Sequence, residues 1–167
     1  MLLGTNPTNE NFSQSEDLVI QLILQQRYAE VYELLINQQP TLRAGLYNMA
    51  LCLHWSGNYN EALSRLESIQ LTALISNGNK LATNNVYMDI KSKQNQTNDY
   101  LQGISELYIK RFPFLFHDAI VRLKTDCWLA LGNYAKVAAI ATPIAHKGYK
   151  NITDALKLAN TANDNRI

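Results

Sequence analysis

The sequence predicts an all-α protein, and three observations lead to that prediction. Apolar residues recur at three- and four-residue spacing, which places them on one face of a helix, as in Phe116, Ile120, Leu123, Cys127 and Leu131. Strand-like alternation is nowhere sustained. The tripeptide Gly-Asn-Tyr occurs at residues 57–59 and 132–134, each time directly after an apolar helical segment. We therefore expect stacked antiparallel helical hairpins containing about nine helices.

Length and composition fit one domain. The chain has 167 residues, of which 47% are hydrophobic, enough for one packed core. We expect residues 1–12 to be flexible and residues 13–163 to form a single helical domain. The 15 basic and 14 acidic side chains give a net charge of +1, which provides no strong field toward phosphates. Nucleic acid is therefore not an expected partner.

No apolar segment approaches the roughly 20 residues that a membrane-spanning helix needs, so no membrane span is predicted. The first ten residues carry neither a basic stretch nor an apolar run typical of a signal peptide. We accordingly expect a cytoplasmic protein.

The first hairpin is predicted near residues 14–38. Its first helix is expected to start with Ser15 as the N-cap and to end near Gln26. The second helix is expected from Tyr28 to Ile36. Pro40 closes it, because the residue before a proline is pushed out of helical geometry.

The second hairpin is predicted near residues 41–70. Its first helix runs from about Thr41 to Ser56 and ends at Gly57, which suits a left-handed C-cap. Its second helix is expected over residues 60–70.

An irregular helical segment is predicted for residues 71–112, because Gly78 and clustered asparagines weaken any single long helix there. One helix is expected over residues 81–92. Asp99 is expected to cap another helix, ended by Phe112 and Pro113, whose apolar face consists of Leu101, Ile104, Leu107 and Tyr108.

The third hairpin is predicted near residues 116–147. Its long first helix is expected over residues 114–131, and its second from Tyr134. Pro143 should bend or end that second helix, because proline removes a backbone hydrogen bond. A C-terminal helix is expected over residues 151–162.

The two Gly-Asn-Tyr segments share a further feature, a small apolar residue three positions after the tyrosine. Glycine permits a tight turn between helices, tyrosine packs across it, and the small residue lets the helices approach closely. A weaker copy lies at residues 26–31. The repeat positions are Gly57, Tyr59 and Ala62 in one copy and Gly132, Tyr134 and Val137 in the other.

This arrangement resembles the tetratricopeptide repeat, in which two helices meet at a Gly-x-Tyr-x-x-Ala turn and repeats are about 34 residues long. Tyr28 and Tyr59 lie 31 residues apart, whereas Tyr59 and Tyr134 lie 75 apart, which fits one repeat plus an inserted segment. Residues 41–70 match best. The resemblance implies a superhelical stack of hairpins with a concave groove, a shape mostly used to bind other proteins or peptides.

By the same resemblance, the inner helices supply the groove. The residues expected to face a partner there are Tyr47, Asn48, Leu51, His54, Trp55, Arg122 and Asp126. One subgroup of the family clamps the terminal carboxylate of a peptide, and Asn48 stands at its asparagine position. However, Glu16 and Ile20 stand where that clamp needs a lysine and an asparagine, so a carboxylate clamp is not expected.

Some of these side chains also have purely structural alternatives. Tyr47 and Trp55 are favoured interface anchors, but they are equally suited to packing against a neighbouring hairpin. Asp126 follows Arg122 by four residues, so the two can form a surface ion pair of little energetic value.

The sequence offers little for catalysis or metal binding. His54, His117 and His146 lie in different predicted helices without metal-ligand spacing. Cys52 and Cys127 lie in apolar helical faces, which predicts buried, free thiols. We expect no enzyme activity, no metal site and no cofactor.

Three functional hypotheses follow. The first is a protein-interaction module or adaptor that binds a peptide or helix of a partner in its groove. The second is a self-associating scaffold, such as a homodimer, in which the apolar end of a short repeat array is buried against another copy. The third is a small-ligand-binding or catalytic helical domain.

Overall fold

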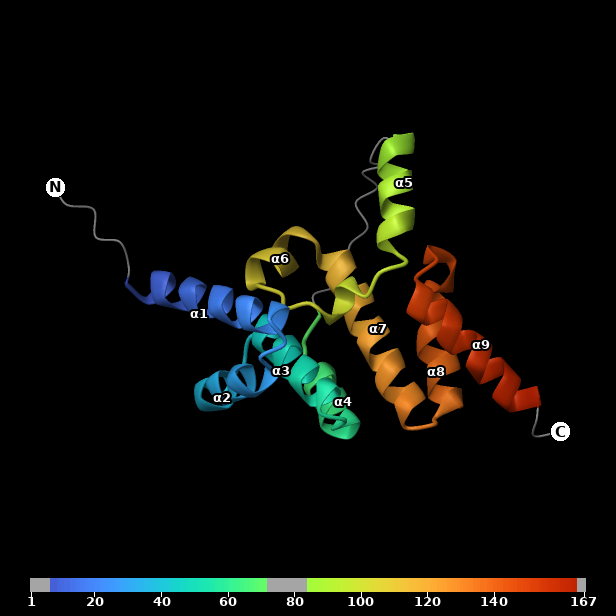
Figure 1. The fold of residues 1–167 in the computed structure, drawn as a ribbon, viewed down its shortest axis with the longest axis horizontal. Helices are drawn as coiled ribbons and strands as arrows, with labels where there is room; N and C mark the ends of the chain where they lie inside the picture. Colours follow the sequence, from blue (N-terminus) through green and yellow to red (C-terminus); the bar gives the residue numbers. More distant parts are fainter. Residues whose placement is uncertain (1–6, 72–83, 165–167) are drawn as a thin grey trace.

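The computed structural model describes residues 7–71 and 84–164, and within these ranges the protein is all-α, as predicted (Figure 1). The described ranges contain nine α-helices and two short 3-10 helices. Their bounds are α1 (Pro7–Leu24), α2 (Tyr28–Gln38), α3 (Arg43–Trp55), α4 (Tyr59–Glu67), α5 (Asn85–Gln94), η1 (Asp99–Leu101), α6 (Glu106–Arg111), α7 (Pro113–Ala130), α8 (Tyr134–Ala141), η2 (Thr142–Lys147) and α9 (Lys150–Asp164).

The turns of the three predicted hairpins have one backbone conformation in common. Gly57 and Gly132 have φ angles of +83° and +69°, and Gln26, which has the corresponding position in the weaker copy, has a φ of +58°. In each turn, the residue that follows the one with positive φ donates its amide hydrogen to the carbonyl five positions before it, over 2.8 to 2.9 Å. Such bonds satisfy carbonyl groups left free at the end of a helix.

The residues that follow each turn pack in equivalent ways. Val31, Ala62 and Val137, three positions after the tyrosines, are completely buried. The tyrosines themselves are partly buried against the hydrophobic clusters. In both Gly-Asn-Tyr copies, the glycine thus has a positive φ, the tyrosine is partly buried and the small residue after it is fully buried.

The helices pack on one another in chain order, with one insertion. α1 packs on α2, α2 on α3, α3 on α4, α7 on α8 and α8 on α9, and α4 packs directly on α7 (Figure 1). Helices α5 and α6 lie between α4 and α7 in the sequence but outside this series. The insertion accounts for the wide spacing of 75 residues between the second and third turns.

The main hydrophobic core lies between α1, α2, α3, α4, α6 and α7. Tyr47 packs edge-on against Phe116, with ring centroids 5.7 Å apart. Cys52 and Cys127 are buried and free, and burial raises the pKa of each thiol to about 12.

The predicted helix that begins at Asp99 is wrong. The chain forms η1, becomes extended at Gln102, and starts α6 only at Glu106, where Ser105 accepts a hydrogen bond from the amide of Tyr108 over 3.1 Å. The interruption lies at Gly103, where a Cβ atom would be only 3.1 Å from the Cα of Ile20. The close approach of this segment to α1 therefore overrides its local helical pattern.

Other predicted boundaries also shift. Helix α1 begins at Pro7, so it extends into the segment 1–12 that was expected to be flexible, while residues 1–6 lie outside the described ranges. Ser15 consequently lies inside α1 instead of capping it, and its hydroxyl accepts a hydrogen bond from Gln38 over 2.8 Å. The helix predicted over 81–92 appears as α5, with residues 81–83 outside the described ranges. Pro143 follows the end of α8, where η2 begins.

Candidate partner-binding site

The predicted groove side of α3 and α7 is covered by the chain itself. Residues 97–106, here named the crossing segment, include η1 and the first residue of α6 and contact α1, α3 and α7. Each contact involves a polar side chain from one of these three helices. The crossing segment decides which predicted groove residues can reach a partner.

Tyr47 and Leu51 are core residues, which corrects their predicted place in the groove. The side chain of Tyr47 is fully buried, and its hydroxyl donates a hydrogen bond to the backbone carbonyl of Tyr100 in the crossing segment. Leu51 is 2% exposed. Because both side chains are buried, neither is accessible to a partner in this structure.

Asn48 is also buried and bonds to the crossing segment. Its side-chain nitrogen donates to the carbonyl of Ile104 over 2.9 Å, and its side-chain oxygen accepts from the amide of Ile104 over 3.0 Å. This residue therefore satisfies both polar groups of a buried backbone position, which otherwise would lack partners.

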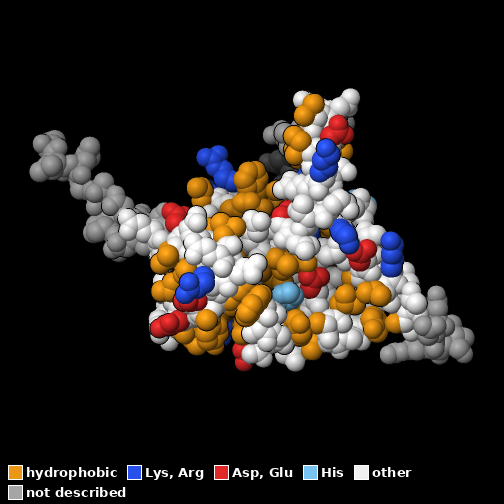
Figure 2. All heavy atoms as spheres, in the orientation of Figure 1, with side chains coloured by type: hydrophobic (Ala, Val, Ile, Leu, Met, Phe, Trp, Pro, Cys, Tyr) orange, Lys and Arg blue, Asp and Glu red, His pale blue; other side chains and the backbone are white. Residues whose placement is uncertain are grey.

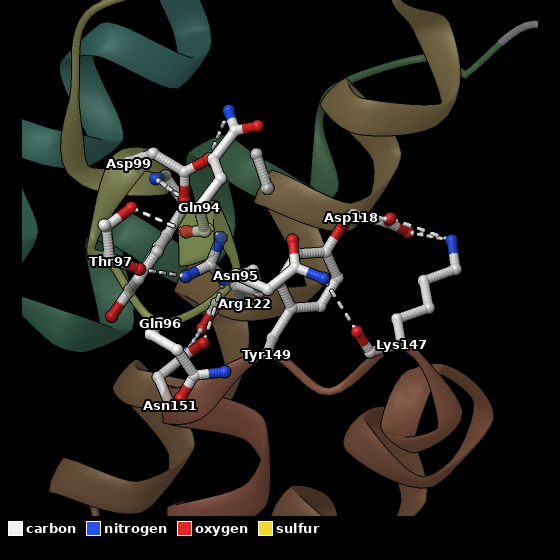
Figure 3. Close-up of polar contacts among 12 residues, drawn as sticks. Gln94, Asn95, Gln96, Thr97, Asp99, Asp118, Arg122, Lys147, Tyr149 and Asn151 are labelled. Carbon is white, nitrogen blue, oxygen red and sulfur yellow. Dashed lines mark hydrogen bonds and ion pairs between the residues drawn. The ribbon is translucent and has the colours of Figure 1, made fainter. Parts of the chain in front are cut away.

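Arg122 is buried as well, so it lies neither in an open groove nor in the alternative surface ion pair with Asp126. The guanidinium pairs with Asp99 at 2.5 Å and donates to the carbonyl of Thr97 over 2.7 Å and to Asn151 over 2.9 Å (Figure 3). Its central carbon lies 4.1 Å and 4.4 Å from the ring centroids of two tyrosines, Tyr100 and Tyr149. The side chain joins the crossing segment to α7 and α9.

Asp126, also expected in the groove, bonds to other residues of the protein. Its carboxylate accepts hydrogen bonds from the hydroxyl of Tyr100 and, over 3.0 Å, from the side-chain amide of Asn151. The burial of Tyr100 and its contact with Asp126 raise the pKa of the tyrosine hydroxyl. Asp126 thus belongs to the same internal polar network as Arg122.

Trp55 and His54 lie at the C-terminal end of α3, where Trp55 is exposed and His54 is partly buried. Trp55 is 62% exposed and stacks on Tyr28, with ring centroids 4.9 Å apart. The rings of His54 and Tyr59 pack edge-on, with centroids 5.6 Å apart. Burial lowers the pKa of the His54 imidazole.

Two glutamates that the sequence did not identify as a pair join α6 to α1 and α3. Glu106 accepts from the amide of Ala44 over 2.7 Å and from the guanidinium of Arg43 over 3.0 Å, at the start of α3. Both carboxylate oxygens of Glu16 lie 3.3 Å from the amide nitrogen of Glu106, which donates to them. Glu16 and Glu106 are 90 residues apart, so no local pattern could have revealed the contact.

A cavity of about 600 Å³ lies between α1, α2 and the start of α3. It opens to solvent, and its walls are mainly apolar. Residues on its walls include Glu16, Val19, Leu35, Gln38, Leu42 and Asn48. Glu16 and Asn48 lie on its walls and also bond to the crossing segment, so the cavity adjoins that segment.

Other kinds of site have little support in the described residues. Within residues 7–71 and 84–164, no group of three or more His, Cys, Asp and Glu side chains has the geometry to hold a metal ion. The described helices also include none with the length and hydropathy needed to span a membrane. On the face shown in Figure 2, basic and acidic side chains are scattered, without a large patch of one sign.

Comparison of the chain with protein-family models, with curated proteins and with solved structures finds no match. The resemblance to tetratricopeptide repeats therefore stays a prediction that depends on the turn motifs. Because one helical architecture supports many functions, the function has to be inferred from the chemistry of the site.

Proposed function

We propose that the protein is an interaction module that binds a segment of a partner protein in the cavity between α1, α2 and α3. The single observation that carries this proposal is the open, mainly apolar cavity of about 600 Å³. Ligand pockets commonly measure about 300–1,000 Å³ and combine apolar walls with a few polar groups. The crossing segment covers the neighbouring part of the groove side, so the cavity is the part that a partner can enter.

The wall residues suit a peptide. Val19 and Leu35 are buried at the base, and Leu42, which is 44% exposed, offers apolar surface to an incoming side chain. Gln39, on the wall, is exposed and carries an amide that can donate to and accept from a peptide backbone. This combination gives affinity through apolar burial and orientation through hydrogen bonds.

The proposal is tested by selecting binders from a random peptide display library with the purified full chain. Fluorescence anisotropy then gives the affinity of the enriched peptides for Leu42→Asn and for Leu158→Asn. Leu158 is a matched control, because it is 55% exposed and lies on α9, away from the cavity. We expect Leu42→Asn to weaken binding at least about tenfold and Leu158→Asn to leave it unchanged. Equal affinities for both variants would contradict the proposal.

A second candidate function is self-association through α5. This helix projects from the rest of the molecule and has no buried residue (Figure 1). Four of its apolar side chains are 47–61% exposed, and hydrophobic atoms are visible on it in Figure 2. These side chains are Val86, Tyr87, Met88 and Ile90. Light scattering at increasing concentration should show a dimer that Ile90→Asp abolishes, and a strictly monomeric wild type would contradict this function.

We further propose that the protein works in the cytoplasm. Cys52 and Cys127 are free and buried, and they form no disulfide. Free thiols in a folded protein fit a reducing compartment better than an oxidising one.

A further inference from the structure

We propose that the cavity selects a partner segment carrying a lysine or arginine side chain next to an apolar residue, and that the carboxylate of Glu16 contacts the cationic group. This inference rests on the proposed function and specifies the chemistry of the bound segment. The occupant is a protein segment with a basic side chain.

The first reason is that Glu16 lies on the cavity wall without a cationic partner. Its hydrogen-bond donor is the amide of Glu106, at 3.3 Å from both oxygens, which is long for a hydrogen bond to a carboxylate. Among the described residues, no lysine, arginine or histidine forms an ion pair with it within 4.0 Å. Its charge is thus poorly compensated inside the protein.

The second reason is the sign of the surrounding charge. Burial raises the pKa of Glu16 above its ordinary value. The hydrogen bond from the amide of Glu106 opposes this rise, whereas the negative charges of Glu106 and Asp17 add to it. Arg43 is engaged by Glu106 and therefore neutralises that carboxylate instead of Glu16. A cation placed in the cavity would reverse these unfavourable effects, whereas a peptide's terminal carboxylate would meet repulsion.

The third reason is the fit of a basic side chain to the cavity. Lysine and arginine have apolar stems that pack along hydrophobic surface while the charged end reaches a polar group. Val19, Leu35 and Leu42 provide such surface on the same walls as Glu16. The volume of about 600 Å³ exceeds that of one ammonium group and leaves room for an adjacent apolar side chain.

The test compares random peptide display selections with the full-length wild type, Glu16→Gln and Asp17→Asn. Glutamine keeps an oxygen that can accept from the amide of Glu106, and thermal unfolding checks that the variant is folded. Asp17→Asn is the matched control. It also removes one negative charge, but from the exposed side chain next to Glu16 in the sequence. Only peptides whose binding is lost with Leu42→Asn are counted as cavity binders.

We expect wild type and Asp17→Asn to enrich lysine or arginine at one position of the cavity binders by about tenfold over Glu16→Gln. Cavity binders without a basic preference, or with the same preference in Glu16→Gln, would overturn the role of Glu16 and leave the proposed function standing. Selections that yield no cavity binders at all would overturn both.

Discussion

The side-chain amide of Asn48 bonds to both backbone polar groups of Ile104, 56 residues further along the chain. Both residues are almost fully buried, so the polar groups that lose these bonds have little access to water. Asn48→Ala should lower the free energy of unfolding by about 2–4 kcal/mol, because two buried backbone groups lose their partner. Urea denaturation measures this loss, with exposed Asn85→Ala as the control. A loss below about 0.5 kcal/mol would mean that water reaches Ile104.

Gly57 should tolerate only residues that accept a left-handed backbone. Apart from the glycine and its two chain neighbours, no atom lies within 4 Å of a Cβ built at this position, so the cost of substitution comes from the φ of +83° and not from a clash. Gly57→Ala should lower stability by about 1–2 kcal/mol, Gly57→Val by more, and Gly57→Asn by less, since asparagine enters this region more readily. Thermal unfolding of the three variants checks the order. Equal melting temperatures would show that the turn relaxes.

Trp55→Ala should cost little stability, because Trp55 is 62% exposed and stacks on the ring of Tyr28. We expect a loss of about 0.5–1.5 kcal/mol, the range of an aromatic pair. Leu51→Ala on the same helix is the comparison and should cost about 2–5 kcal/mol, since Leu51 is buried. We expect Trp55→Ala to bind the cavity-binding peptides with unchanged affinity. A clear loss of affinity would mean that the partner also contacts Trp55 and Tyr28.

Arg122→Lys should destabilise the protein although it keeps the charge. Lysine cannot reach Asp99, Thr97 and Asn151 together, nor stack as a plane between two tyrosine rings. We expect a loss of about 2–3 kcal/mol in urea denaturation. Arg65→Lys is the matched control, because Arg65 is exposed, and it should change stability by less than about 0.5 kcal/mol. Similar values for the two variants would contradict the internal role of Arg122.

Glu16 should make stability fall as the pH rises. Its pKa is raised in the folded protein, so the folded state binds the proton more tightly than the unfolded state does. The resulting contribution is fully present below the unfolded pKa, near 4.5, and is lost as the pH rises through the folded pKa. Between the unfolded and the folded pKa of Glu16, the wild type should therefore lose stability relative to Glu16→Gln as the pH rises. Parallel pH profiles of the two proteins would contradict a raised pKa.

The hairpins could be predicted because their determinants are local. A helix ends at Gly57 because that residue accepts a positive φ, and the following turn depends on hydrogen bonds within six residues. The three- and four-residue spacing of apolar side chains likewise gives helices whatever they pack against. The sequence by itself therefore determined the all-α class, the three Gly-Asn-Tyr-like turns and the burial of the small residues that follow them.

Only the tertiary structure decided which helical faces meet solvent. Tyr47, Asn48 and Arg122 lie on the face expected for a groove, yet the crossing segment buries all three. The path of that segment depends on Gly103, whose missing side chain permits contact with α1. Burial is the sum of contacts between residues far apart in the chain, such as Glu16 and Glu106, so local periodicity does not encode it.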